Sequence, residues 1–212
     1  MIKKRSMLLP NLIKCKGLYL KQPFTFLETA DLGTGIIFQQ IDKTLIMTKE
    51  YDWSQFVCKI NINSTVESIY DAWTIPRHLE TWFLRSATFR DEDGDLRDKN
   101  LHLRAGDTYE WFWYGYADNV VEKGKVLAAN GMNKLQFSFT RGAEVIVDIG
   151  TSFNETIVML TQSNMPDGED GKRIRIDCMA GWSFYLANFK SRMARGIDLR
   201  NKNVDLINMV NS

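Results

Sequence analysis

The sequence predicts an α+β protein with a helix-grip fold, in which a curved antiparallel sheet of six to seven strands wraps around one long C-terminal helix. Three observations predict this fold. A strand pattern at residues 56–62 is followed at once by two short helix patterns. Alternating apolar and polar residues then extend to about residue 162, and an amphipathic helix pattern follows them. In this arrangement a pocket is often left open between the sheet and the last helix.

The first strand and the two short helices have clear local signals. Apolar residues alternate over residues 56–62. The sequence S-x-x-E at residues 64–67 is a capping box, which predicts a helix start with Ser64 as its cap. This helix ends before Pro76, because proline disfavours helical geometry at the preceding Ile75, and a second helix begins near the proline. The predicted buried faces contain Val66, Ile69, Tyr70 and Trp73 in the first helix, and Leu79, Trp82 and Phe83 in the second.

The segment at residues 109–116 contains six aromatic side chains and predicts a strand with rings on both faces. In an extended chain the side chains alternate between two faces, with Tyr109, Trp111 and Trp113 on one face and Glu110, Phe112 and Tyr114 on the other. Three wide rings on one face suit a curved sheet that closes over a core or a pocket. Plain core packing and a ring-lined ligand cavity are both open interpretations.

Turn signals separate the remaining strands. We predict strands from about Ala87 onward, including residues 120–128, 135–139, 145–149 and 157–160. Asn130-Gly131 predicts a type I′ hairpin turn, because both residues tolerate a positive φ. Arg141-Gly142 turns the chain again. Short connections of this kind make an antiparallel sheet the expected arrangement.

The long C-terminal helix is predicted after a polar loop at residues 165–168. Asp177 is its predicted cap, and Gly196 supplies its stop. The apolar stripe of this helix contains Trp182, Tyr185, Leu186, Phe189 and Met193. The tail at residues 197–212 has enough apolar residues to dock on the domain but too few to form its own core.

Charge and pattern together divide the chain. Residues 1–46 hold seven Lys or Arg against three acidic residues and show no sustained period, so we predict an N-terminal appendage there. Residues 47–196 form the predicted domain, and Met47 is a candidate alternative start. The net charge of the whole chain is only +1, which leaves the domain mildly acidic. This balance disfavours a nucleic-acid groove, which needs clustered Lys and Arg.

Composition disfavours several other kinds of site. Cys15, Cys58 and Cys178 are widely separated and odd in number, which indicates neither a disulfide framework nor a zinc cluster. His78 and His102 form no metal-binding motif, so we expect no metal ion and no cofactor. The basic N-terminal segment lacks the features of a secretory signal. No stretch approaches the ~20 apolar residues of a membrane span, and we therefore predict a cytoplasmic protein.

Three short motifs carry a resemblance to a known superfamily. They are D-A-W-T-I-P at residues 71–76, L-E-T-W-F at residues 79–83 and G-W at residues 181–182. Over about residues 54–196 the chain resembles the SRPBCC (START-like) superfamily, in the branch named after the carboxy-terminal domain of the heat-shock-protein-90 ATPase activator. The resemblance implies the fold but no single function, because the superfamily includes lipid carriers, hormone receptors and polyketide cyclases. The eukaryotic activator also depends on a separate amino-terminal domain, which residues 1–46 are too short to supply.

The favoured function is binding of a small hydrophobic molecule, aromatic or acyl in character, between the sheet and the last helix. The predicted ligand-binding residues are aromatic: Trp82, Tyr109, Trp111, Trp113, Phe137, Trp182, Tyr185 and Phe189. Hydroxyl groups of Tyr109 and Tyr185 and the indole nitrogens are available to orient the ligand. The alternative for the family motif residues, Trp73, Trp82, Phe83 and Trp182, is a structural role in the core.

Two other functions are open. A cyclase- or hydrolase-like enzyme would use a pocket acid or base, and the available groups are Glu110, Glu122, Asp148 and His102. These groups form no recognisable catalytic set, so we nominate no catalytic residue. An acid buried beside the tryptophans would favour the enzyme, because burial raises the pKa of a carboxyl group. A co-chaperone would instead bind its chaperone through an exposed sheet face, with Phe112 and Tyr114 as anchors.

Overall fold

The computed structural model describes residues 51–203, 205, 206, 209 and 211 of the chain. The predicted appendage at residues 1–46 and the proposed start at Met47 lie outside these residues. In chain order the elements are β1 (Phe56–Ile62), α1 (Val66–Thr74), α2 (Pro76–Trp82), β2 (Ser86–Arg90), β3 (Thr108–Phe112), β4 (Glu122–Ala129), β5 (Lys134–Phe139), β6 (Ala143–Ser152), β7 (Glu155–Ser163) and α3 (Gly168–Arg195).

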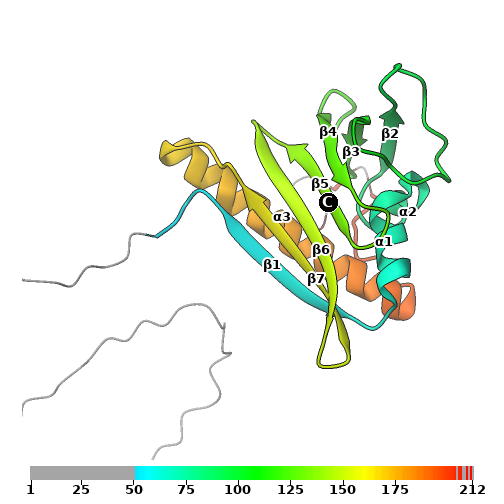
Figure 1. The fold of residues 1–212 in the computed structure, drawn as a ribbon. Coiled ribbons are helices and arrows are strands. Elements are labelled where there is room, and N and C mark those ends of the chain that lie inside the picture. Colours follow the sequence, from blue (N-terminus) through cyan, green and yellow to red (C-terminus); the bar gives the residue numbers. More distant parts are fainter. Residues whose placement is uncertain (1–50, 204, 207–208, 210, 212) are drawn as a thin grey trace, which may run out of the picture. The chain divides into compact units, whose positions relative to one another are not determined.

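The seven strands form one sheet in the order β1-β7-β6-β5-β4-β3-β2, and every neighbouring pair is antiparallel. Strands β2 to β7 follow one another as in the chain, and β1 is added at the β7 edge. Helix α3 lies along one face of the sheet beside β1, while α1 and α2 lie near its C-terminal end (Figure 1). The predicted helix-grip fold is therefore confirmed.

Aromatic rings fill one end of the space between the sheet and the helices. The Trp82 ring of α2 lies 4.5 Å from the Phe189 ring of α3 and 4.7 Å from the Trp73 ring of α1, measured between centroids. All three side chains are at most 1% exposed. Burial of a large ring contributes a few kcal/mol, so this cluster holds α1 and α2 against α3.

Helices α1 and α2 separate at Ile75, as predicted from the proline that follows it. The cap of α1 differs from the prediction. Thr65 rather than Ser64 is the capping residue, since its Oγ1 accepts a 3.1 Å hydrogen bond from the N–H of Ser68. Both hydroxyl residues stand before the helix, and the sequence pattern alone does not decide which one adopts the extended cap conformation.

Helix α3 begins at Gly168, with Asp167 at the cap position, about three turns before the predicted Asp177. Its first turns are mostly polar, so they carry little of the apolar period on which the prediction rested. Glu169 and Asp170 lie in the first turn, where negative charge favours the helix N-terminus. The end of the helix is as predicted, because Gly196 has a φ of 71° at the cap. Among the described residues, no helix combines the length and apolar character that a membrane crossing requires.

The aromatic strand is shorter than predicted. β3 ends at Phe112, and the chain then turns through Gly115, which has a φ of 76°. Tyr109 and Trp111 are buried on the inner face, as the alternation predicts. Trp113 lies beyond the end of the strand and is half-buried. Its ring is therefore not fixed in the core in the way that the Trp111 ring is.

The predicted hairpin at Asn130-Gly131 exists, but the predicted type I′ turn is wrong. Four residues, 130–133, connect β4 and β5, and of the predicted pair only Gly131 has a positive φ. The Oδ1 atom of Asn130 closes the loop instead by accepting from the backbone N–H groups of Met132, Asn133 and Lys134. Two other turns, at Arg141-Gly142 and Phe153-Asn154, have the positive φ at both central residues that a type I′ turn requires.

Candidate functional site

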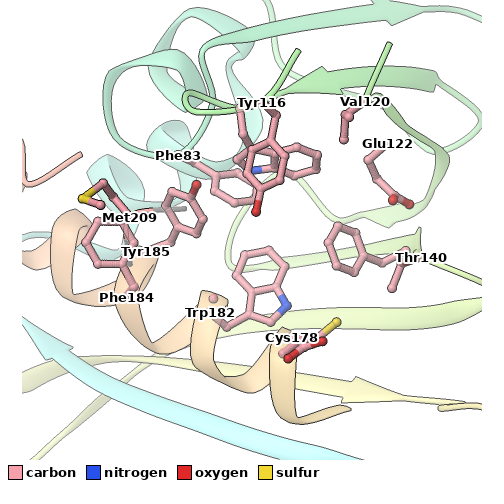
Figure 2. Close-up of a pocket in the computed structure, with 14 residues that line it drawn as sticks. Phe83, Tyr116, Val120, Glu122, Thr140, Cys178, Trp182, Phe184, Tyr185 and Met209 are labelled. Carbon is pink, nitrogen blue, oxygen red and sulfur yellow. The ribbon is translucent and has the colours of Figure 1, made fainter. Parts of the chain in front are cut away.

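A pocket of about 340 Å³ lies between the middle of α3, the start of β4 and the end of β5, beside the loop that follows β3. We call it the α3 pocket (Figure 2). Half of its lining residues are aromatic: Phe83, Trp113, Tyr116, Phe139, Trp182, Phe184 and Tyr185. The others are Val120, Glu122, Thr140, Asp177, Cys178, Gly181 and Met209. Cavities that hold small molecules start at about 300 Å³, so the α3 pocket is large enough for one compact ligand.

One face of α3 forms the floor of the pocket. Cys178, Gly181, Trp182 and Tyr185 follow at spacings of three, one and three residues, which brings them to the same side of a helix. Gly181 has no side chain, and apart from its two chain neighbours and the backbone of its own helix, no described atom lies within 4 Å of the position that a Cβ would take there. The helix surface is therefore open at Gly181, next to the Trp182 ring.

The Trp182 ring is a fixed wall of the pocket. Its Nε1 atom donates a 2.8 Å hydrogen bond to Oε1 of Gln162, which is fully buried on β7. The ring stacks on Phe83 at 5.0 Å and lies 5.5 Å from the Phe139 ring. The contacting residues belong to the end of α2 and to two strands, so they hold the Trp182 ring in position in the absence of a ligand.

Glu122 brings a carboxylate into the α3 pocket. It lies opposite Trp111 in the β3–β4 register, so its side chain shares the inner face of the sheet with that buried ring. Burial raises the pKa of the Glu122 carboxyl group, and a hydrogen bond from the backbone N–H of Thr140 lowers it in part. Within the described part of the chain, no Lys, Arg or His side chain forms an ion pair with Glu122.

Cys178 and Tyr185 lie on the same helical face and carry protonated groups. Burial raises the pKa of the Cys178 thiol, and the charges of Asp177 and Glu122 raise it further against a hydrogen bond with Gln162. Burial likewise raises the pKa of the Tyr185 hydroxyl. The thiol is therefore a poor nucleophile at neutral pH, and the phenol remains a neutral hydrogen-bonding group.

The C-terminal tail reaches the pocket as well. Arg200 is buried and donates hydrogen bonds to the backbone carbonyls of Glu80, Thr81 and Leu84, at the end of α2. This polar anchor holds the start of the tail at the end of α2, whereas Leu199 and Leu206, two of the tail's apolar residues, are exposed. Met209 lines the pocket, and in Figure 2 it lies at the same end as Phe184 and Tyr185.

Of the eight predicted ligand-binding residues, Trp113, Trp182 and Tyr185 line the α3 pocket. The other five, Trp82, Tyr109, Trp111, Phe137 and Phe189, are at most 3% exposed and contact one another or neighbouring rings in the core. Tyr109 shows the pattern: its ring stacks on Trp111 at 4.0 Å, and its hydroxyl donates to the carbonyl oxygen of Ser138. That hydroxyl is therefore engaged by the sheet itself.

The predicted list omits most of the pocket residues. The predicted helix could have indicated two of them. Cys178 lies four residues before Trp182, on the same helical face, and Gly181 directly precedes Trp182. Glu122 gave no such signal, because its inward orientation depends on the register across the long connection between β3 and β4. Tyr116 and Met209 lie in irregular segments, where no periodicity shows which way a side chain points.

Of the four acid or base candidates, only Glu122 lines the α3 pocket. Glu110 forms a 2.6 Å ion pair with Lys123, which lowers the pKa of the Glu110 carboxyl group. Asp148 lies 3.6 Å from Lys134. His102 contacts Thr74 Oγ1 at 2.8 Å. The residues that the structure describes contain no group of three or more His, Cys, Asp or Glu side chains placed to hold a metal ion.

The two predicted anchors for a chaperone are partly covered by cations of the same chain. Phe112 and Tyr114 are both half-buried. The guanidinium carbon of Arg85 lies 5.7 Å from the Phe112 ring centre, and that of Arg200 lies 5.3 Å from the Tyr114 ring centre. These rings therefore do not form an open apolar patch.

Comparison with known proteins identifies the fold and one family. The family model described as activator of Hsp90 ATPase homolog 1-like protein matches residues 63–194. The chain is similar to the solved Aha1 dimer from Colwellia psychrerythraea, with a TM-score of 0.51 and 19% identity, over 67% of this chain and 97% of that one. For a protein from Staphylococcus saprophyticus the TM-score is 0.54 and the identity 12%, over 69% and 96% of the two chains.

A third solved structure, DynU16 from the dynemicin biosynthetic locus, has a TM-score of 0.52 and 16% identity, over 68% of this chain and 48% of that one. Identities this low show a shared fold and nothing about activity. Among curated proteins, none matches the chain with significant similarity.

Proposed function

Because the chain belongs to the family of activator of Hsp90 ATPase homolog 1-like proteins, we propose that it uses its helix-grip domain to bind a small apolar molecule in the α3 pocket. The observation that carries this proposal is a cavity of about 340 Å³ with seven aromatic side chains around it. Apolar walls with a few polar groups are typical of small-molecule sites. Hydrogen bonding of Trp182 to Gln162 supports a preformed site, which lowers the entropic cost of binding.

The proposal is tested by titrating the protein with N-phenyl-1-naphthylamine, a neutral probe whose fluorescence rises in apolar surroundings. We expect saturable binding by the wild type. Gly181→Leu places a side chain in the open space of the helix floor and should weaken binding at least tenfold. Ala180→Leu, at the neighbouring exposed position of α3, is the matched control and should bind as the wild type does. Equal binding by both variants would reject the α3 pocket as the site.

A second candidate is an enzyme that uses Glu122 as a general acid. One specific observation favours it, namely a partly buried carboxyl group with a raised pKa inside an apolar pocket. Hydrolysis of 4-nitrophenyl butyrate discriminates the two candidates. An enzyme would lose most of its rate in Glu122→Gln, whereas a binding protein would show the buffer rate in both forms.

Family membership supports a chaperone as a further partner. The direct test is the ATPase rate of a purified Hsp90-type chaperone with and without the full chain. Stimulation of the ATPase that persists in Gly181→Leu would show that the chaperone does not bind through the α3 pocket.

We also propose that the protein is cytoplasmic, since Cys58 and Cys178 are free thiols among the described residues.

A further inference from the structure

We propose that the ligand of the α3 pocket is an organic cation, a compact apolar molecule that carries one protonated or quaternary nitrogen. This inference rests on the binding function proposed above and adds the chemical class of the ligand. The expectation from the sequence, a hydrophobic molecule of aromatic or acyl character, did not specify a charge.

The charges around the pocket have a single sign. Glu122 and Asp177 are its charged lining residues, and no Lys, Arg or His side chain is among the described residues that line it. Neither carboxylate forms an ion pair within the part of the chain that the structure describes. A carboxylate ligand such as a fatty acid would therefore meet like charge, whereas a cation would supply the missing counter-charge.

The two carboxylates act at the same end of the pocket. Glu122 points inward from the start of β4, and Asp177 precedes Cys178 on α3. Both residues line the pocket, and Asp177 is the chain neighbour of Cys178, which lies at the Glu122 end of the pocket. Figure 2 shows Glu122, Thr140 and Cys178 together at this end, while Phe184, Tyr185 and Met209 lie at the other. The pocket thus has an acidic end and an apolar end.

Aromatic rings complete the environment that a cation prefers. Trp182 lies between the two ends in Figure 2, and Phe139 lies 5.5 Å from it. Trp113 and Tyr116 contribute further rings from the loop after β3. The negative face of an aromatic ring attracts ammonium groups, most strongly for Trp, and the attraction grows when water is excluded. An ammonium group near Glu122 with an apolar body toward Phe184 would satisfy both ends at once.

A neutral apolar ligand fits this pocket less well. It would further desolvate the half-buried Glu122 carboxylate without giving it a counter-charge, and an unpaired buried charge is costly. A cation of the same shape removes that cost. The discrimination should therefore depend on charge at constant shape, which is the quantity to measure.

Three naphthalene derivatives of similar shape provide the test, with affinities measured by calorimetry at pH 7.5. They are 1-naphthylmethylamine, which is cationic, 1-naphthylmethanol, which is neutral, and 1-naphthoate, which is anionic. We expect the amine to bind at least tenfold tighter than the alcohol, and the naphthoate to bind most weakly. Glu122→Gln should remove most of the amine's advantage and change the affinity of the alcohol by less than about twofold.

Two further variants keep the test decisive. Asp177→Asn removes the second carboxylate from a different element, so it carries the same expectation if Glu122→Gln does not fold. Glu110→Gln, on the neighbouring strand but paired with Lys123 outside the α3 pocket, should leave all three affinities unchanged.

The outcomes separate the two proposals. Equal affinity of the amine and the alcohol would overturn the cation inference and leave the binding function standing. An amine advantage that survives both Glu122→Gln and Asp177→Asn would also overturn it. If none of the three compounds binds saturably while N-phenyl-1-naphthylamine does, the cation inference fails and the binding function stands; if that probe does not bind either, both fail.

Discussion

The indole Nε1 atom of Trp182 donates a hydrogen bond of 2.8 Å to Oε1 of Gln162, and both side chains are at most 3% exposed. Gln162 lies on β7 and Trp182 on α3, so the bond ties the long helix to the inner face of the sheet. The Nε2 atom of Gln162 contacts the sulfur of Met165. A buried polar group on the sheet thus orients the central ring of the α3 pocket.

We predict that Gln162→Leu lowers the free energy of unfolding by about 1–3 kcal/mol, because it leaves the buried indole N–H without an acceptor. Urea unfolding monitored by circular dichroism measures the effect. Gln136→Leu is the control. Gln136 lies on β5, is only half-buried and donates to Glu144, so this substitution should lower the free energy of unfolding by less than about 1 kcal/mol. Equal losses of unfolding free energy in the two variants would show that the Gln162–Trp182 hydrogen bond stabilises the fold no more than the Gln136–Glu144 bond does.

Gly124 on β4 provides a second prediction. A Cβ at this position would lie 2.5 Å from the Tyr109 hydroxyl oxygen, because the Tyr109 ring crosses β4 to donate to Ser138 on β5. Gly124→Ala should therefore destabilise the protein by about 1–3 kcal/mol through overpacking. Gly150→Ala on β6 is the matched control, since no atom lies within 4 Å of its Cβ position. A thermal midpoint unchanged by Gly124→Ala would contradict the position of the Tyr109 ring over Gly124.

Two glycines of α3 should respond to alanine in opposite ways. At Gly181 the Cβ position is open, so Gly181→Ala should raise the free energy of unfolding by up to about 1 kcal/mol through helix propensity. At Gly171 the Cβ would lie 1.6 Å from the carbonyl oxygen of Pro166, so Gly171→Ala must displace backbone and should be clearly destabilising. Denaturant unfolding of the pair gives the sign of each change. A loss of stability at Gly181 would show that the helix floor is filled.

Glu122 predicts an unusual pH dependence. The pKa of its carboxyl group is raised by burial in the folded state, in surroundings that include Tyr109, Asp177 and Cys178. Ionised Glu122 therefore costs stability above its folded-state pKa, and the cost disappears as the pH falls through that pKa towards the unfolded-state value of about 4.3. Glu122→Gln should accordingly be more stable than the wild type at pH 7.5, and the difference should shrink near pH 4.

Glu110→Gln should show the opposite sign in the same unfolding experiment. The ion pair with Lys123 lowers the pKa of Glu110, so this carboxylate favours the folded state above the unfolded-state pKa, and its contribution falls as the pH drops. Identical pH profiles for the two variants would contradict the inward orientation of Glu122.

The sequence was sufficient for the fold because its strong periods lie in the elements that build it. The alternation at residues 56–62 and the stripe around Trp182 each required burial on one side, and Pro76 fixed the break between α1 and α2. The start of α3 was missed, since its first turns are mostly polar and are stabilised by caps and helix charges instead of by an apolar face.

The site was predicted less completely for a different reason. Trp111 and Trp113 have the same parity in the sequence, yet the strand ends at Phe112, and only the tryptophan beyond that end lines the pocket. Glu122 faces inward because of the β3–β4 register, which is set by pairing across a connection without a turn signature. Side-chain direction within regular elements follows from sequence, whereas direction in loops and across long connections follows from packing.

Binding in the α3 pocket is tested most directly by fluorine NMR of the protein labelled with 5-fluorotryptophan, which reports on its six tryptophans one by one. Trp113 and Trp182 line the pocket, whereas Trp53 lies outside it and is 37% exposed. Trp→Phe variants at these three positions assign the resonances. At saturation with N-phenyl-1-naphthylamine we expect the Trp113 and Trp182 resonances to shift and that of Trp53 to stay in place. Probe binding that shifts Trp53 and leaves Trp113 and Trp182 unmoved would contradict a ligand site between the sheet and α3.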